Sequence, residues 1–190
     1  MYHFYALIAR MKFISRWGLM RSTVPENVAE HSLMTAVLAH ALAAIGRDIL
    51  HKHIDPAACA ERALFHDCAE IFTGDLPTPV KYWSEGLREA YREAEEHSAS
   101  RLLELLPPQL RGTLSRAIDE RDDECGRVVR AADKLAAHIK CLEEIRMGNS
   151  EFEQAARQTL EKLAAMKCEE ADYFREHFLP SFSLTLDDLR

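Results

Sequence analysis

The sequence predicts an all-α protein, a compact helical bundle, and three observations carry this prediction. Glycine and proline are sparse, at seven each in 190 residues, and they lie between long segments rather than inside them. Within those segments, apolar residues recur at the spacing of three and four that marks one face of a helix. No segment of useful length alternates apolar and polar residues as a half-buried strand would. We expect a single domain over residues 1–190.

Three helices are expected in the first part of the chain. One covers roughly residues 2–14, where apolar residues follow helical spacing. After a loop, the second helix begins at Asn27, a good N-cap, and runs to Ala44. It is apolar nearly all round, which predicts a central position in the fold. The third begins at Asp55, a cap followed by proline in the first turn, and continues to Phe72.

Three further segments complete the expected bundle. A proline-punctuated loop, DLPTPVKYW, leads to a charged segment over residues 85–106 that ends at two prolines. A helix is expected over residues 124–147, where Gly148 ends it. The last long helix is expected over residues 151–178, before Pro180.

Charge and cysteine usage exclude several classes of protein. The formal net charge of −7, from 31 acidic and 24 basic residues, argues against a broad electrostatic surface for nucleic acid, although it allows one small phosphate. The five cysteines include no C-x-x-C pair, which argues against a disulfide framework or a thiolate zinc site and favours a reducing cytoplasm. Because the N-terminus lacks a signal-peptide pattern and no apolar stretch reaches about 20 residues, we expect no membrane partner.

Two histidines and two aspartates lie on expected helices that are otherwise apolar: His31, His66, Asp67 and Asp133. A charged carboxylate inside an apolar helix is costly unless something neutralises it. Imidazole and carboxylate together suit Mn, Co, Fe or Zn rather than Mg alone. One such histidine is more often a hydrogen-bonded core residue than a ligand, but four residues that include an adjacent His-Asp pair favour a metal site. Glu70 follows that pair at helical spacing and is expected on the same face.

The order of these four residues resembles the H…HD…D ligand pattern of the HD-domain superfamily of metal phosphohydrolases. Longer strings, SRWGLMRS, ENVAEHSL, HDCAEIFTGDLPTPVKY, ADKLAAHIKCLEE and DYFREHFLPSF, resemble more specifically the bacterial 5′-deoxynucleotidases of the YfbR type. The similarity is collinear from the first helix to about Leu186, and the departures fall at His138 and in residues 47–54.

This resemblance implies a homodimeric enzyme of the HD-domain type that hydrolyses deoxyribonucleoside 5′-monophosphates to deoxyribonucleoside and phosphate. It implies selectivity against ribonucleotides and 3′-monophosphates. It also implies one divalent transition metal ion, Co²⁺ or Mn²⁺, with Zn²⁺, Cu²⁺ or Fe²⁺ as alternatives. The resemblance assigns metal ligation to His31, His66, Asp67 and Asp133, catalysis to Glu70, Asp75 and Arg16, and substrate contacts to Arg16, Trp17, His31, Asp67, Asp75, Leu76, Pro77, Thr78 and Asp133.

The residues themselves allow more ordinary roles. An isolated arginine in a loop, as Arg16 is expected to be, is more often solvated than bound to phosphate, and Trp17 fits a core position as well as a sugar contact. Asp75 follows Gly74 and suits a turn. His40 is interpreted as a core histidine, because it lies nine residues after His31 and therefore on another face.

Two alternative functions remain open from the sequence. One is another HD-type nucleotide phosphohydrolase or phosphodiesterase, although such enzymes tend to be larger. A dinuclear HD enzyme needs additional histidines, and only His97 lies between Asp67 and Asp133. The other is a non-catalytic nucleotide-binding HD module, which the intact set of candidate ligands disfavours.

Overall fold

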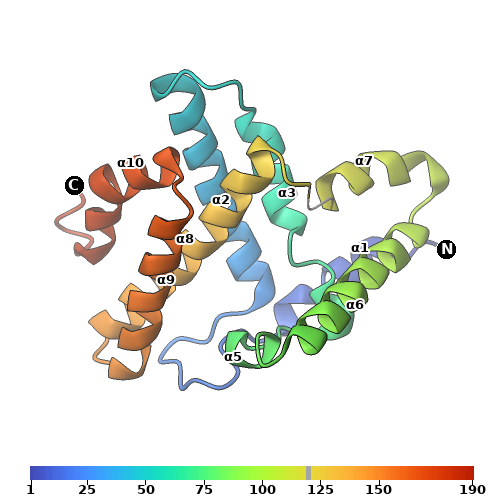
Figure 1. The fold of residues 1–190 in the computed structure, drawn as a ribbon, viewed down its shortest axis with the longest axis horizontal. Coiled ribbons are helices and arrows are strands. Elements are labelled where there is room, and N and C mark those ends of the chain that lie inside the picture. The colour runs from blue at the N-terminus through green and yellow to red at the C-terminus, as the bar shows by residue number, and fades with distance from the viewer. Residues whose placement is uncertain (119–120) are drawn as a thin grey trace.

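The computed structural model describes residues 1–118 and 121–190, and Figure 1 shows this part of the chain folded as a set of packed helices. The described residues contain no strand; a single antiparallel bridge pairs Ser15 with Asn27. The predicted all-α class is therefore confirmed.

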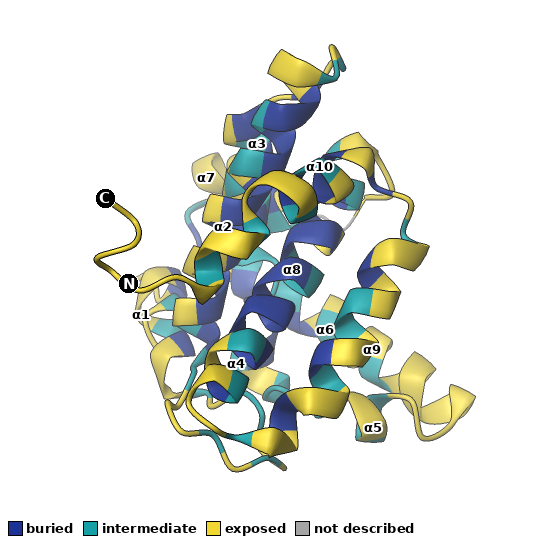
Figure 2. Ribbon diagram, turned by 90° about the vertical axis from the view of Figure 1, so that its left-hand side faces the viewer, coloured by how far each residue is buried: buried dark blue, intermediate teal, exposed yellow. Residues whose placement is uncertain are grey.

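The centre of the fold is α2 (Val28–Ala44), packed against α3 (Pro56–Phe65) and α8 (Glu124–Arg146). The start of α2 is the predicted one. The Asn27 side chain accepts a hydrogen bond from the Glu30 backbone N–H, and the Glu30 carboxylate accepts one from the Asn27 N–H. This reciprocal cap satisfies two of the N–H groups that every helix start leaves free. Figure 2 shows that α8 is largely buried, so these helices form the core from which the candidate site residues project.

The other helices surround this core. In chain order they are α1 (Phe4–Ile8), η1 (Met11–Phe13), η2 (Ile45–Ile49, a π-turn), α4 (Glu70–Thr73), α5 (Thr78–Lys81), α6 (Glu85–Glu104), α7 (Pro108–Ile118), η3 (Ser150–Phe152), α9 (Glu153–Ala165), α10 (Glu169–His177) and η4 (Leu179–Ser183). In Figure 1, α6 and α7 form an arm on one side of the molecule, while α9 and α10 lie on the other side of α8.

Three predicted helices are interrupted in the structure. The first ends at Ile8, and a short 3₁₀ turn follows it. The predicted helix of about 13 residues is too short to be stable from its own propensity, so tertiary packing decides where it ends. The third ends at Phe65, so residues 66–69 form a turn instead of lying inside a helix. Adjacent residues of a continuous helix point about 100° apart. His66 itself keeps helical backbone angles, with φ of −59° and ψ of −36°, yet its Nε2 lies 3.1 Å from Asp67 Oδ2.

The last predicted helix is divided into α9 and α10. Lys167 adopts a left-handed conformation with φ of 50°, which ends the helical path, and α10 then packs back onto the core through Ala171 and Phe174. The helix α7 was not predicted at all. His40 is exposed, so its interpretation as a core histidine is wrong.

The 22-residue segment Val28–Ile49 is long and apolar enough to cross a membrane by length and composition alone, and its most apolar 18-residue window has a mean hydropathy of 1.4. This corrects the expectation that no apolar stretch reaches such a length. Within the fold, 56% of its most apolar window is buried, as expected for the core helix of a bundle.

Candidate metal centre and active site

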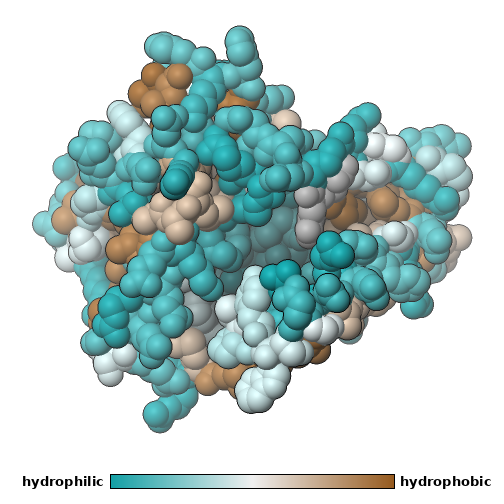
Figure 3. Space-filling view, in the orientation of Figure 1, coloured by the Kyte–Doolittle hydropathy of each residue, from teal (hydrophilic) through white to brown (hydrophobic). Residues whose placement is uncertain are grey.

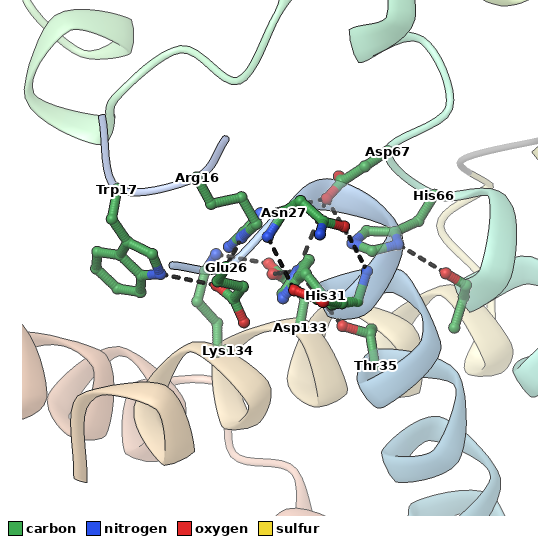
Figure 4. Close-up of polar contacts among 12 residues, drawn as sticks. Arg16, Trp17, Glu26, Asn27, His31, Thr35, His66, Asp67, Asp133 and Lys134 are labelled. Atoms are coloured by element: carbon green, nitrogen blue, oxygen red, sulfur yellow. Dashed lines mark hydrogen bonds and ion pairs between the residues drawn. The ribbon is translucent and has the colours of Figure 1, made fainter. Parts of the chain in front are cut away.

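Three elements that are distant in sequence bring their side chains together at one point. His31 comes from α2, His66 from the turn after α3, and Asp133 from α8; one ligand atom of each lies within 4.8 Å of the others. His31 Nε2 is 3.1 Å from Asp133 Oδ1, and Thr35, one turn further along α2, places its hydroxyl 3.4 Å from the same nitrogen. Figure 4 shows these side chains facing one another.

Asp67 completes the predicted set. Its Oδ2 lies 3.1 Å from His66 Nε2 and 3.7 Å from His31 Nε2. The structure therefore places His31, His66, Asp67 and Asp133 around a common space, as the sequence predicted.

The donor atoms in this space suit a divalent cation. His66 Nε2 is buried and makes no hydrogen bond of good geometry among the described residues, so its 3.1 Å approach to Asp67 Oδ2 is a charge contact only. The Nδ1 of His66 is 2.7 Å from the Ala63 carbonyl, a contact that orients the ring with Nε2 toward the other candidate ligands. Two imidazoles and two carboxylates make a donor set that transition metals prefer.

The pKa shifts of the site residues also favour positive charge: the pKa of His66 is raised and that of Asp67 is lowered. Burial alone would lower the pKa of His66, but the carboxylates of Asp67 and Asp133 outweigh it and raise that pKa to about 9. Burial alone would raise the pKa of Asp67, but the two histidines hold it at about 2. The carboxylates thus create a field that stabilises a cation here, and protons compete with a metal ion for these atoms.

Arg16 and Trp17 lie beside this centre on the loop before α2. Arg16 is largely buried, with 12% of its side chain exposed, so it is not a solvated surface arginine. Its Nη1 is 3.4 Å from Asp67 Oδ2, and its Nε donates to Glu26 Oε2 at 3.1 Å. Trp17 is half-buried, and its ring packs against Phe152 with a centroid distance of 5.2 Å.

Two clefts meet at the metal centre. The smaller, which we call the loop cleft, has a volume of about 220 Å³ and lies between the Arg16–Trp17 loop, the loop over residues 75–79, α8 and α9. Every predicted residue of the segment from Asp75 to Thr78 lines it, together with Asp133. The loop cleft therefore brings together most of the side chains that the sequence assigned to substrate.

The larger cleft, which we call the arm cleft, has a volume of about 640 Å³ and lies between the α6–α7 arm and the faces of α8 and α9. Figure 3 shows the molecular surface hollowed in this region. His66, Asp67 and Glu70 line it, and Asp133, Lys134 and Lys162 line both clefts. Of the four candidate ligands, Asp133 lines both clefts, His66 and Asp67 line the arm cleft, and His31 is completely buried behind them.

Glu70 and Asp75 belong to different clefts. Glu70 is the first residue of α4 and is 8% exposed, and its Oε2 has no hydrogen-bond partner in the described part of the chain. Burial, with the nearby carboxylates of Asp67 and Asp75, raises its pKa to about 10. Burial also raises the pKa of Asp75, against the opposing effect of Arg16. A buried carboxyl group with a raised pKa near a candidate metal site is a candidate for proton transfer, and both residues fit that description.

Several side chains at the site were not predicted. Glu26 accepts hydrogen bonds from both Arg16 and Trp17, and Lys134 places its Nζ 2.7 Å from Asp133 Oδ2. Lys134 could have been predicted near the site because it follows Asp133 in the sequence. Glu26 could not, because nothing in its local pattern distinguishes it from a surface glutamate. His138 is buried between α8 and α9, where its Nδ1 is 3.1 Å from the Ala156 carbonyl.

Comparison with known proteins places this geometry in a family. Residues 3–182 match the family described as YfbR-like 5′-deoxynucleotidase. A 5′-deoxynucleotidase from Erwinia tasmaniensis is 43% identical over 189 residues, covering 98% of this chain and 96% of the relative.

Solved structures share the fold. The crystal structure of a HD-domain phosphohydrolase from Listeria innocua superposes with a TM-score of 0.83 at 25% identity, covering 95% of this chain and 88% of that one. A predicted metal-dependent phosphohydrolase from Magnetospirillum magnetotacticum gives a TM-score of 0.66 at 26% identity, covering 91% and 88%. The chain, with its two histidines and two aspartates at the meeting point of two clefts, belongs to the YfbR-like 5′-deoxynucleotidase family and has the HD-domain phosphohydrolase fold.

Proposed function

We propose that this protein hydrolyses deoxyribonucleoside 5′-monophosphates to deoxyribonucleoside and phosphate, with selectivity against ribonucleotides and 3′-monophosphates. One observation carries the proposal: Arg16, Trp17 and the candidate ligand Asp133 line the same cleft, and Arg16 also contacts Asp67. The cleft therefore offers a guanidinium for a phosphate and an aromatic ring for a sugar beside the candidate metal centre. In this arrangement the phosphate lies at the metal and the sugar lies in the loop cleft.

His31, His66, Asp67 and Asp133 would hold one divalent transition metal ion, for which we propose Co²⁺ or Mn²⁺, with Zn²⁺, Cu²⁺ or Fe²⁺ as alternatives. When bound, such an ion withdraws charge from the phosphoryl oxygens and lowers the pKa of a bound water. The donor chemistry of the site and the description of the Magnetospirillum structure as metal-dependent support this role.

Arg16 orients the phosphate with its planar guanidinium, which can donate two parallel hydrogen bonds to phosphate oxygens. Its contact with Asp67 keeps it next to the metal centre, and its burial keeps its donors out of bulk water. Both effects hold the phosphorus in one position for attack.

Glu70 deprotonates the attacking water from the arm cleft. The bond from the water oxygen to phosphorus forms as the bond from phosphorus to the sugar O5′ breaks, and these two oxygens lie in line on opposite sides of the phosphorus. Asp75, on the loop-cleft side, supplies a proton to the departing O5′. A cation at the metal site opposes the repulsion that raises the pKa of Glu70 and so favours its ionised form as a base.

Trp17 lies against the deoxyribose and provides no polar partner for a 2′-hydroxyl. Burying that hydroxyl without a hydrogen bond costs roughly 1–3 kcal/mol, which corresponds to about tenfold to a hundredfold discrimination. A 3′-monophosphate is excluded because its phosphate cannot reach the metal with the sugar in the same place.

We further propose that the protein acts in the cytoplasm as a homodimer. Three large apolar side chains on α2 are exposed, at 60% for Leu33, 41% for Met34 and 56% for Val37. A contiguous exposed apolar face on a central helix favours contact with a second copy.

The proposed activity is tested by measuring phosphate release from a panel of nucleotides with the metal-stripped protein and added Co²⁺ or Mn²⁺. The panel contains deoxyribonucleoside 5′-monophosphates, the matching ribonucleotides, 3′-monophosphates, triphosphates and cyclic nucleotides. Release confined to the first class supports the proposal. Release mainly from triphosphates or cyclic nucleotides would instead assign another HD-type activity, and no release from any would favour a binding module.

A further inference from the structure

We propose that Glu26 is a positioning residue that holds Arg16 and Trp17 as one unit and thereby sets the sugar selectivity of the enzyme. The inference rests on the proposed function, in which Arg16 contacts the phosphate and Trp17 the sugar.

A single carboxylate oxygen links the two residues. Glu26 Oε2 accepts from Arg16 Nε at 3.1 Å and from Trp17 Nε1 at 2.8 Å, as Figure 4 shows. Glu26 is itself largely buried, with 15% of its side chain exposed, so water competes little for these contacts. Hydrogen bonds to an ionised acceptor in such surroundings are about twice as strong as neutral ones.

The backbone brings Glu26 to this position. Arg16 N–H donates to the Glu26 carbonyl at 3.0 Å, and the bridge between Ser15 and Asn27 pairs the same two stretches of chain. Asn27 is the N-cap of α2, so the carboxylate of Glu26 is fixed to the start of the helix that carries His31. The position of the Arg16–Trp17 pair is thereby tied to the metal centre.

Trp17 needs such an anchor more than Arg16 does. Its φ of 59° lies in the left-handed region, which is unfavourable for a residue with a side chain and persists only where the surroundings enforce it. The packing of the ring against Phe152 and its cluster is apolar and non-directional, whereas the Nε1–H bond to Glu26 is directional and fixes the orientation of the ring. Arg16 keeps a second partner in Asp67 when Glu26 is removed.

The first experiment measures the position of Trp17 without substrate. The sequence contains two tryptophans, and the other, Trp83, is 83% exposed, so a Trp83→Phe background isolates the fluorescence of Trp17. In this background Glu26→Ala is expected to raise the acrylamide quenching constant severalfold, because the indole is no longer held. Glu26→Gln, which retains an acceptor oxygen for Nε1, is expected to restore most of the protection.

The second experiment measures selectivity as the ratio of kcat/KM for dAMP over that for AMP. Glu26→Ala is expected to reduce this ratio about tenfold, the usual effect of losing one charge-assisted hydrogen bond. Glu26→Gln is expected to keep a ratio near that of the wild type while raising KM for both nucleotides, since Arg16 then loses one of its two charged partners and keeps only Asp67.

The matched control is Glu30→Ala, which removes a nearby carboxylate that caps α2 and contacts neither Arg16 nor Trp17. Circular dichroism and metal content verify that each variant folds. The proposal is overturned if Glu26→Ala leaves either the quenching or the ratio unchanged, or if Glu30→Ala changes both equally. A wild type that hydrolyses no 5′-nucleotide would remove the proposed function instead, and the quenching series would still show whether Glu26 anchors Trp17.

Discussion

Glu70 and Asp75 line two different clefts that share Asp133, Glu70 the arm cleft and Asp75 the loop cleft, and burial together with the charge of Asp75 contributes to the raised pKa of Glu70. An in-line displacement at phosphorus needs one group on the side of the attacking water and another on the side of the leaving oxygen. Arg16 and Trp17 line the loop cleft, which is where the proposed function places the nucleoside. The separation into two clefts favours Glu70 as the base and Asp75 as the acid in that proposal.

Replacing Glu70 by Gln should separate chemistry from binding. The variant keeps the size of the side chain and leaves the candidate metal ligands in place, so metal content and nucleotide affinity should match the wild type. Turnover should fall about 100-fold or more, the usual contribution of a positioned base. Single-turnover kinetics with dAMP measure the step directly, and Glu96→Gln, at an exposed carboxylate on α6, serves as the control. Near-normal turnover would reduce Glu70 to a group that braces the ligands.

Replacing Asp133 by Asn should remove the metal. The substitution takes away one of four anchors and a neutralising charge, while the size of the side chain is unchanged. We expect metal content, measured by elemental analysis after dialysis, to fall severalfold, and activity to fall with it unless metal is supplied in excess. Asp172→Asn, at an exposed aspartate of α10, should retain full occupancy. If Asp133→Asn also retained it, Asp133 would not be a ligand.

The sequence predicts those site residues that stand out from their immediate neighbours in the chain, and it misses those that tertiary contacts bring to the site. The four candidate ligands could be found because a charged or imidazole side chain conflicts with the apolar helix around it, as for His31 in α2. Glu26 could not, because its role arises from a backbone pairing between Ser15 and Asn27 that places distant side chains together.

The helix boundaries show the same limit. Periodicity continues through His66 and Lys167, yet the chain turns at both places. At the first, the helical hydrogen bonding ends although His66 keeps helical backbone angles, and at the second the chain returns α10 to the core. Tertiary contacts override helical propensity at such boundaries.

Replacing Trp17 by Ala tests the origin of sugar selectivity. The loss of the aromatic wall should lower kcat/KM for dAMP and bring the ratio of dAMP over AMP closer to one, because the 2′-hydroxyl is then solvated rather than buried. The measurement is kcat/KM for dAMP divided by kcat/KM for AMP, determined for the wild type and for Trp17→Ala. If the wild type prefers dAMP over AMP and Trp17→Ala has the same ratio, the selectivity does not come from Trp17, and residues 75–78 become the next candidates.

Replacing Val37 by Glu tests the proposed dimer. A charge at the exposed apolar face of α2 should shift the protein toward monomer, since a buried unpaired carboxylate is costly in an interface. Light scattering coupled to size-exclusion chromatography measures the mass. A matching charge on another exposed apolar residue, Leu189→Glu near the C-terminus, should leave the mass unchanged. An unaltered dimer in Val37→Glu would exclude this face.

Replacing Glu170 by Gln should destabilise the fold in a pH-dependent way. Glu170 is completely buried, receives two hydrogen bonds from Arg127 at 2.9 Å each, and lies 3.0 Å from Lys52 Nζ. Burial alone would raise its pKa, but the two cations outweigh it and lower the pKa from 4.5 to about 2. A shift of that size corresponds to about 3 kcal/mol of stability at neutral pH.

The sign follows from which state binds the proton more tightly. Because the folded pKa of Glu170 lies below the unfolded one, its contribution is complete above the unfolded pKa of about 4.3 and is lost as the pH falls toward about 2. The free energy of unfolding of Glu170→Gln, measured by urea denaturation, should therefore fall furthest below that of the wild type near pH 7. The two should converge under acid conditions. Glu169→Gln is the control: this neighbour also contacts Lys52, at 2.7 Å, but its side chain is 70% exposed. An exposed pair contributes about 1 kcal/mol or less. Equal losses in the two variants would contradict the account, because they would mean that burial between Arg127 and Lys52 adds nothing to the strength of the contact.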